Sequence, residues 1–448
     1  QTYLWAMPLV NTLGMQVGSE KTFGAGYNVL PIWKERLDAK TLVTTPNSDV
    51  LYAMSYVDLG KDGPLVMDAP PELQGILLDY WQRPIPVDGG KFFGDAGLAG
   101  PDGGKGGKFL ILPPGYKGAV PKGYFVYRSG TNNVFIFLRG FYENPKNLTP
   151  AVAHLERTKI YPLKGEADAK PMKFPDASGV PVNMLPISDG SAFDQLKHLV
   201  DKESDDLAGP DWLGMLAAIG IVKGQPFTPD AHAREILDQA AKTAYRMSRV
   251  IGFEEVVGGL SYVVYPDHHW INLTADGTPA KPSGVVNLTW LNTAGSYLAL
   301  DARINFFTNY YSISPGMLSY TPGKGANYMI AFTDSEGASL SGGSNYRLHL
   351  PPNIPARIFW SMTLYDAENS SGLANGQPFP SLGSRDKPAQ NADGSTDLYL
   401  GPETPAGKQA NWLATVPGKG YFAIIRLYGP EEASINRSWK PSYLEAVK

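Results

Sequence analysis

The sequence predicts a mainly β protein with a helical connector, an α+β fold whose two β-domains are sandwiches or jelly-roll-like sheet pairs. Short runs of alternating apolar and polar residues occur toward both ends of the chain, as in strands with one buried face. Between them, apolar residues recur at helical spacing. The 49 glycines and 38 prolines stand between the short runs, where turns are needed. This pattern favours many short strands and few long helices.

Residues 1–40 are expected to form an N-terminal helical segment, because apolar side chains are dense at its start. A β-rich domain is expected for residues 41–149. Its clearest strand alternates Val50, Tyr52 and Met54 with the residues between them. Further strands are expected at turn-separated intervals typical of a sandwich or barrel, over residues 65–67, 76–81, 108–112, 124–127 and 134–138.

The glycine-rich tract over residues 90–107 is expected to be a mobile loop. Its two Gly-Lys pairs, at 104–105 and 107–108, invite comparison with a phosphate-binding loop. Such a loop also needs a glycine five residues before the glycine of the pair and a Ser or Thr directly after the lysine. Ala99 or Asp102 stands at the first position, and Gly106 or Phe109 at the second. The sequence therefore favours a plain loop.

Residues 150–324 are expected to form a helical connector and linking segments that pack the two β-domains together. Thr228 is expected to cap a long helix, because Pro229 follows it in the first turn. One face of that helix is indicated by apolar residues at helical steps: Ile236, Leu237, Ala240, Ala244, Met247 and Ile251. Another helix is expected over residues 299–311.

A second β-rich domain is expected for residues 325–448. In its first clear strand, Leu348 and Leu350 alternate with Arg347 and His349. A turn with three prolines around Asn353 follows, since proline cannot donate to a ladder. The next strand alternates Ile358, Trp360, Met362 and Leu364 with Phe359, Ser361, Thr363 and Tyr365.

The two β-rich parts carry short motifs in a fixed order. The C-terminal part has Asn345-Tyr-Arg-Leu-His349, Phe359-Trp-Ser-Met-Thr-Leu-Tyr-Asp366, Asn391-Ala-Asp-Gly394, Asn411-Trp412-Leu413 and Arg426-Leu427-Tyr428. In that order these motifs resemble the bacterial domain-of-unknown-function family 1214. The N-terminal part, with Thr45-Pro-Asn-Ser-Asp-Val-Leu-Tyr52 and Pro113-Pro-Gly-Tyr-Lys-Gly118, resembles family 1254. The resemblance implies a two-domain bacterial protein and no settled reaction.

Composition excludes several classes of function. A net charge of −4 over 448 residues gives no basic surface for nucleic acid or an anionic membrane. The longest apolar run, residues 215–222, is too short for a membrane span. The chain has no cysteine, which excludes disulfides, thiolate metal sites and cysteine nucleophiles. The missing cysteine and the start at Gln1 favour a periplasmic or secreted protein whose signal peptide has been removed.

Histidine offers one metal-like cluster, the pair His268 and His269 after Asp267. Both imidazoles can reach one ion only if this segment is a loop, which Pro266 permits. A divalent metal at the pair is one hypothesis, and a loop without metal is the alternative. The histidines on helical stretches lack the spacing of a metalloprotease helix and are expected to have surface or packing roles.

A ligand site is expected where Arg347 and His349 share one strand face and Tyr365 and Arg426 join them from neighbouring strands. The residues that alternate with this set are apolar, so a single sheet face would collect the polar side chains. Two nearby guanidinium groups repel one another unless an anion or carboxylate lies between them. A small anionic or carboxylate-bearing ligand is the expected occupant, and an ordinary polar outer face is the alternative.

The sequence leaves two functions open. One is an exported protein that binds a small molecule in a cavity lined by aromatic and arginine side chains, with no reaction assigned. The other is a secreted or periplasmic hydrolase-like enzyme acting on a small molecule or polymer fragment, although no Gly-x-Ser-x-Gly motif is present. In either case a homo-oligomer is expected, because the edges and apolar patches of two β-domains need a cover.

Overall fold

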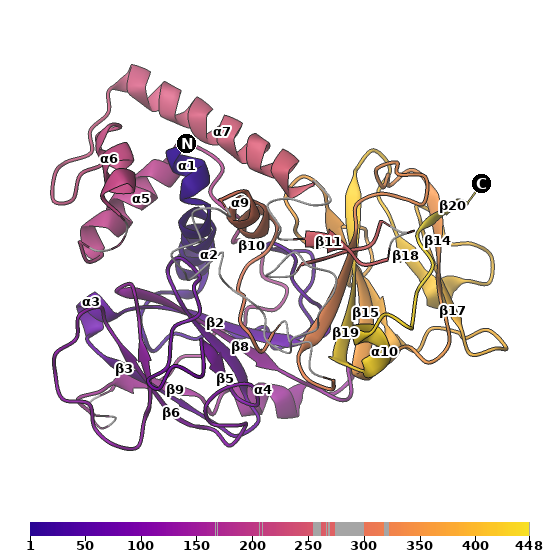
Figure 1. Ribbon diagram of the computed structural model, residues 1–448, viewed down its shortest axis with the longest axis horizontal. Coiled ribbons are helices and arrows are strands. Elements are labelled where there is room, and N and C mark those ends of the chain that lie inside the picture. Colours follow the sequence, from indigo (N-terminus) through magenta and orange to yellow (C-terminus); the bar gives the residue numbers. More distant parts are fainter. Residues whose placement is uncertain are drawn as a thin grey trace.

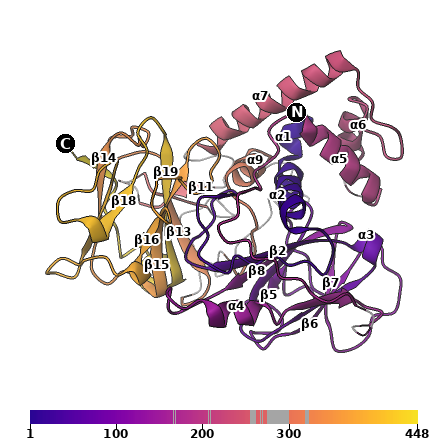
Figure 2. The same cartoon turned by 180° about the vertical axis from the view of Figure 1, so that it is seen from behind.

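The computed structural model describes residues 1–165, 167, 169–205, 207, 209–253, 261–265, 267, 269–273, 300–317 and 322–447. The chain folds into two β-sandwiches, one from the N-terminal and one from the C-terminal part, with helices above and between them (Figure 1). The view from behind shows the same arrangement (Figure 2). The mainly β, α+β fold class expected from the sequence is thereby confirmed.

The N-terminal sandwich consists of two four-stranded sheets. The first has the order β2 (Leu51–Asp58), β8 (Asn133–Gly140), β4 (Gln74–Asp79) and β5 (Asp95–Ala96). The second has the order β7 (Phe125–Arg128), β6 (Gly107–Leu112), β3 (Leu65–Ala69) and β9 (Lys159–Pro162). A separate parallel pair joins β1 (Thr41–Leu42) to β10 (Val182–Asn183).

The sheet that contains β2 is buried on both of its faces. Leu51 and Ala53 point into the sandwich core, whereas Tyr52, Met54 and Tyr56 point to a second core that lies under the helices. Alternate residues of β2 therefore point into two different apolar cores, and neither face is exposed to solvent. The expectation of one buried and one exposed face is wrong for this sheet.

The C-terminal sandwich pairs a six-stranded sheet with a four-stranded sheet. The larger sheet has the order β11 (Ser261–Val263), β12 (Ile271–Leu273), β13 (Ala326–Ala331), β19 (Tyr421–Pro430), β15 (Ala356–Asp366) and β16 (Ser381–Gly383). The smaller has the order β18 (Trp412–Ala414), β17 (Thr396–Gly401), β14 (Asn345–Leu350) and β20 (Glu445–Val447).

The six-stranded sheet also faces two cores. Along β19, Ala423, Ile425 and Leu427 fill the sandwich, and Phe422 and Ile424 point the other way. All residues of β19 are buried. The core shared by this outward side, by β2 and by the helices thus joins the two sandwiches, and it holds the candidate site.

Helices cover this shared core. They are α1 (Thr2–Trp5), α2 (Met7–Phe23), α5 (Ser191–Lys202), α6 (Pro210–Ala217), α7 (Ala231–Gly252) and α9 (Leu300–Asn309). Shorter ones flank the sandwiches: α3 (Leu59–Asp62), α4 (Thr149–Leu155), α10 (Glu432–Ile435) and the 3-10 turns η2 (Ser384–Asp386) and η3 (Gln409–Asn411). Among the residues the structure describes, we find no helix with the length and apolar character of a membrane span.

Helix α2 lies against β10 because of two glycines one turn apart. A Cβ atom on Gly14 would lie 2.0 Å from the carbonyl oxygen of Leu185, and one on Gly18 would lie 1.9 Å from that of Asn183. Both distances are far below van der Waals contact, so only glycine permits this approach.

Helix α7 begins later than the sequence predicts. Its N-cap is Asp230, whose side chain accepts a hydrogen bond of 2.8 Å from the backbone N–H of Ala233, so the expected cap at Thr228 is wrong. Leu237 is buried as expected, but Ile236 is exposed. Helix α9, by contrast, lies within the predicted range 299–311.

The glycine-rich tract, expected to be a loop, contains the short strand β5 and a turn organised by Asp102. The buried Asp102 carboxylate accepts hydrogen bonds from the backbone N–H groups of Gly97, at 2.7 Å, and Gly106, at 3.1 Å. This part of the tract is therefore built around a carboxylate, which is unsuitable for binding a phosphate group.

Candidate functional site

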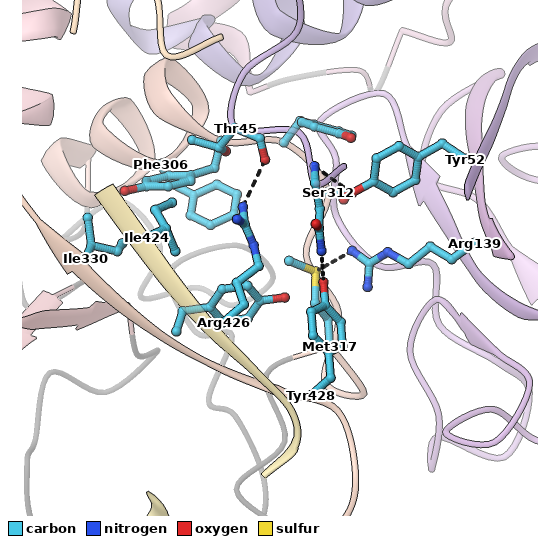
Figure 3. A pocket seen from close by; sticks show the side chains of 14 residues that line it. Thr45, Tyr52, Arg139, Phe306, Ser312, Met317, Ile330, Ile424, Arg426 and Tyr428 are labelled. Atoms are coloured by element: carbon cyan, nitrogen blue, oxygen red, sulfur yellow. Dashed lines mark hydrogen bonds between the residues drawn. The ribbon is translucent and has the colours of Figure 1, made fainter. Parts of the chain in front are cut away.

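A cavity of about 50 Å³ lies in the shared core between the two sandwiches (Figure 3). Its walls come from β2, β8, β13 and β19, from the Thr45–Asn47 segment and from the chain that follows α9. The polar side chains in the lining are two arginines, several tyrosines and smaller hydroxyl or amide groups. The lining residues are Thr45, Asn47, Tyr52, Arg139, Phe306, Tyr310, Tyr311, Ser312, Met317, Tyr328, Ile330, Ile424, Arg426 and Tyr428.

Arg426 reaches the cavity from β19 and is only 4% exposed. Its Nη1 donates hydrogen bonds to the hydroxyls of Tyr365, at 2.6 Å, and Thr363, at 3.3 Å, and its Nη2 donates to the carbonyl oxygen of Thr45 at 3.2 Å. Burial lowers the pKa of Arg426, but the surrounding tyrosine oxygens, led by Tyr365, outweigh burial and leave that pKa above its ordinary value. The guanidinium is therefore charged.

Arg139 reaches the cavity from β8, on the opposite side (Figure 3), and is 7% exposed. Its Nη2 donates a hydrogen bond of 3.4 Å to the sulfur of Met317, and its Nε has no partner. A thioether is a weak acceptor for a guanidinium. Burial lowers the pKa of Arg139, but nearby tyrosine oxygens, led by Tyr328, raise it above its ordinary value. A second buried positive charge therefore faces the cavity.

Neither arginine has a carboxylate within ion-pair distance among the described residues. The tyrosines do not supply negative charge, because burial raises the pKa of Tyr52 and of Tyr328. A buried charge without a counter-charge is strongly unfavourable, and two like charges lining one cavity add repulsion. The arrangement suits an anion that accepts hydrogen bonds from both guanidinium groups.

The segment from Thr45 to Tyr52 forms one end of the cavity and contacts both sandwiches. The Asn47 side-chain amide donates to the Tyr428 hydroxyl at 2.5 Å, and its backbone N–H donates to the Tyr52 hydroxyl at 3.1 Å. Thr45 has a φ of +42°, a left-handed conformation that is uncommon for a β-branched residue. Such strain persists only where surrounding contacts hold it, and it clusters at functional sites.

Asp49, in the same segment, links the N-terminal sandwich to the C-terminal one through hydrogen bonds. Its buried carboxylate accepts from Arg36 at 2.8 Å and from the Ser381 hydroxyl at 2.9 Å, and Arg385 donates to its carbonyl oxygen at 2.6 Å. Asn47 and Asp49 are residue types that are common in turns. Their side chains do bond within the turn, since the Asp49 N–H donates to the Asn47 side-chain oxygen at 2.8 Å, but they also join the two sandwiches.

Asp95 lies near Arg139 and holds the chain that follows α9. Its carboxylate accepts from the Ser314 hydroxyl at 2.6 Å and from the Gly316 N–H at 2.9 Å. Burial raises the pKa of Asp95 to about 7, although these hydrogen bonds and the Arg139 charge lower it. Close to neutral pH this carboxyl group is thus partly protonated, so it is a poor permanent counter-charge for Arg139.

The four residues predicted to form a ligand site lie in two places. Tyr365 and Arg426 are hydrogen-bonded to each other in the six-stranded sheet. Arg347 and His349 belong to β14 in the other sheet of the sandwich, where exposed Arg347 pairs with Glu445 at 2.8 Å and half-buried His349 pairs with Asp397 at 2.8 Å. The expectation that all four side chains share one sheet face is wrong, because the two pairs lie in different sheets of the sandwich. Whether either pair binds a ligand stays a prediction.

The predicted metal pair cannot be assessed as a pair, since His268 lies outside the described residues. His269 is half-buried, with its Nδ1 3.4 Å from the Thr333 hydroxyl and its ring against Tyr443. Within the described ranges no group of three or more His, Cys, Asp or Glu side chains is placed to hold a metal ion. The divalent metal stays a prediction.

Sequence reasoning missed Arg139, Tyr328 and Tyr428 as site residues. The one available signal was Arg139 itself, a charged residue directly after the apolar run Val134–Leu138 of a predicted strand. Nothing in the sequence indicates that this strand and β19 would line one cavity, because only the tertiary fold brings them to opposite sides of it.

Comparisons with known proteins agree with this two-part organisation. Residues 27–162 match the model of a family described as protein of unknown function (DUF1254), and residues 325–432 match that of a second such family (DUF1214). The chain is therefore a protein of the type that combines these two domains, and the resemblance drawn from its sequence motifs is confirmed. No curated protein matched it.

Two solved structures are similar along nearly the whole chain. The VPA0106 protein from Vibrio parahaemolyticus is 18% identical with a TM-score of 0.55, and the match covers 100% of this chain and 98% of that one. A putative uncharacterized protein from Burkholderia cenocepacia is 13% identical with a TM-score of 0.42, covering 99% of this chain and 87% of that one. At these identities the first likeness shows a shared fold alone.

Proposed function

We propose that this protein binds a small anionic molecule, one that carries a carboxylate, in the cavity between its two sandwiches. The observation that carries the proposal is the pair of buried guanidinium groups, Arg139 and Arg426, that line one cavity without a carboxylate partner among the described residues. Ligand sites are typically cavities lined by apolar and aromatic side chains with a few convergent polar groups. This cavity has that composition.

The hydrogen bonding of Arg139 supports the proposal further. Most buried polar groups in proteins have partners, but the Arg139 guanidinium, which also lies over the Phe137 ring, donates its one printed hydrogen bond to a thioether and keeps an unpartnered Nε. A carboxylate oxygen near Met317 would accept from Nη2 and reduce the repulsion between the two arginines. Tyrosine hydroxyls around both guanidinium groups can donate to the same anion.

The alternative is a hydrolase-like enzyme at the same site. The described lining offers guanidinium, phenol, amide and hydroxyl groups, with no histidine or carboxylate to act as a general base. The geometry therefore supports binding better than base-assisted hydrolysis.

We also propose that the protein is exported, to the periplasm or out of the cell, since a cysteine-free chain suits an oxidising compartment. Fractionation of the producing cells tests this.

Thermal unfolding of the full chain in sodium acetate, sodium benzoate and sodium phosphate, against sodium chloride of equal ionic strength, tests the binding proposal. A ligand that binds only the folded state raises the melting temperature as its concentration rises. We expect acetate or benzoate to stabilise the protein, and Arg139→Gln to weaken this response by about 1.5 to 3 kcal/mol, the contribution of a charge-assisted hydrogen bond.

Arg128→Gln is the matched control, because it removes an exposed guanidinium of the same N-terminal sandwich, which pairs with Asp88 and does not line the cavity. Its response to the anions should equal that of the wild-type protein. Equal melting temperatures in all four salts, or equal responses in Arg139→Gln and wild type, would overturn the proposal.

A further inference from the structure

A larger cleft of about 610 Å³ adjoins the cavity and opens toward the surface. Arg139, Met317 and Tyr428 line both spaces, so they form the boundary between them. The cleft lies between the glycine-rich tract of the N-terminal sandwich and the start of β15 in the C-terminal one. A molecule whose charged end occupies the cavity would therefore extend into this cleft.

The cleft presents apolar side chains that ordinary folding would bury. Leu98, from the N-terminal sandwich, is 66% exposed and Ile358, from the C-terminal one, is 51% exposed, and Phe141, directly after β8, is 38% exposed. Large apolar side chains gathered at one opening indicate contact with an apolar partner. Because these side chains lie beside a positively charged cavity, the partner they indicate is amphipathic.

Ile358 is exposed because of an irregularity in β15. The sequence pattern places Ile358 on the same face as buried Trp360, but the pairing of β15 with β19 shifts its register between Ala356 and Phe359. A bulge of this kind re-aims a side chain and occurs often next to functional sites. Here it turns an isoleucine into the cleft instead of the sandwich core.

We propose that the cavity and the cleft together bind a monocarboxylate with an apolar tail. The carboxylate is held by Arg139 and Arg426, and the tail runs past Met317 and Tyr428 along Leu98, Phe141 and Ile358. This inference rests on the proposed function, because it assigns the anion to the same two arginines. It adds the class of ligand: a fatty-acid-like or aryl-substituted acid, in preference to a small dianion.

Calorimetric titration of the full chain with octanoate, acetate and octanamide separates the contribution of the carboxylate to binding from that of the apolar tail. Octanoate and acetate share the carboxylate, and octanoate and octanamide share the tail. Because each buried methylene strengthens binding by about fourfold, we expect octanoate to bind at least about tenfold more tightly than acetate. We expect octanamide to bind at least about tenfold more weakly than octanoate, the change that loss of a charge-assisted hydrogen bond produces.

Ile358→Asp tests the cleft without touching the arginines. The variant should lose most of the advantage of octanoate over acetate while keeping its affinity for acetate. Val250→Asp is the control, because Val250 is 67% exposed on α7 and does not line the cleft. Its titrations should match those of the wild-type protein.

The outcomes distinguish this inference from the proposed function. If acetate and octanoate bind equally well, or if Ile358→Asp and Val250→Asp behave alike, the tail assignment is wrong and the anion site stands. If octanamide binds as tightly as octanoate and Arg139→Gln binds both unchanged, the cleft takes apolar molecules without the anion site, and this inference is overturned. If no carboxylate binds, both proposals fail.

Discussion

Arg426 donates a hydrogen bond of 2.6 Å to the hydroxyl of Tyr365, and that hydroxyl donates one of 2.6 Å to the carbonyl oxygen of Pro46. Arg426 and Tyr365 come from the six-stranded sheet, and Pro46 comes from the segment that leads into β2. One chain of hydrogen bonds therefore links the two sandwiches at the cavity. The residues that position the candidate ligand groups also hold the domains together.

Replacing Tyr365 by Phe should destabilise the protein. The change leaves the Pro46 carbonyl oxygen and an Arg426 N–H without their partner in a buried position, which costs about 1 to 3 kcal/mol. Urea unfolding followed by fluorescence measures the difference. Tyr399→Phe is the control: Tyr399 is half-buried on β17 and its hydroxyl makes no hydrogen bond to described residues, so it should change stability little. Equal stability of Tyr365→Phe and Tyr399→Phe would contradict the linking role.

The Asp49 carboxylate should contribute strongly to stability. Asp49→Asn weakens a buried ion pair with Arg36 and a hydrogen bond from Ser381, for which we expect a loss of roughly 2 to 4 kcal/mol in the free energy of unfolding. Asp88→Asn, which breaks the exposed pair with Arg128, should lose less than about 1 kcal/mol. Guanidinium chloride unfolding of both variants gives the comparison, and a similar small loss in both would show that Asp49 does not join the domains.

Asp95 should make stability fall as pH rises toward neutrality. Its pKa is about 7 in the folded protein against an ordinary value of 3.8, so between these values the folded state keeps a proton that the unfolded state has released. Stability from this group is therefore complete below about pH 4 and is lost as pH rises through about 7, a change on the order of 4 kcal/mol. The groups that set this pKa besides burial are Ser314, Gly316 and Arg139.

Comparing wild type with Asp95→Asn isolates that contribution, because other titrating groups are common to both proteins. Urea unfolding at intervals from pH 4 to pH 8 should show that the stability of the wild type, taken relative to that of Asp95→Asn, falls as pH rises. A difference that stays constant across this range would mean that the Asp95 carboxyl does not titrate there.

The protein should be a homo-oligomer. The edge strands of two sandwiches and the apolar side chains exposed at their surface are commonly covered by symmetric self-association. Multi-angle light scattering at micromolar concentration should give a mass that is a multiple of 48.5 kDa. A mass near 48.5 kDa itself would contradict this expectation and leave the edges covered by the protein's own loops.

Local periodicity was sufficient to predict most of the secondary structure near the site. The alternation around Tyr52 and around Trp360 predicted β2 and β15, and the helix expected over residues 299–311 contains α9. Alternation assigns residues to two faces but does not say what each face meets. Because both inner sheets lie between two cores, the face that carries Arg426 is buried, although the sequence pattern is the same as that around exposed Arg347.

The partners of each arginine depend on contacts that are distant in the sequence. Arg139 and Arg426 approach one cavity only because β8 and β19 pack against a shared core, and no local pattern encodes that packing. The bulge that exposes Ile358 breaks the alternation from which its burial would be inferred. Residues that form the site are thus the ones for which local rules fail.

A crystal of the full chain soaked with 4-iodobenzoate places both ends of a ligand in one anomalous-scattering experiment. We expect the carboxylate within hydrogen-bond distance of Arg139 and Arg426, and an iodine peak in the cleft beside Leu98 and Ile358. Arg139→Gln crystals treated in the same way should lack the peak. An empty cavity in the wild-type crystal, or a peak that is unchanged in Arg139→Gln, would contradict the assignment of the two buried arginines as an anion site.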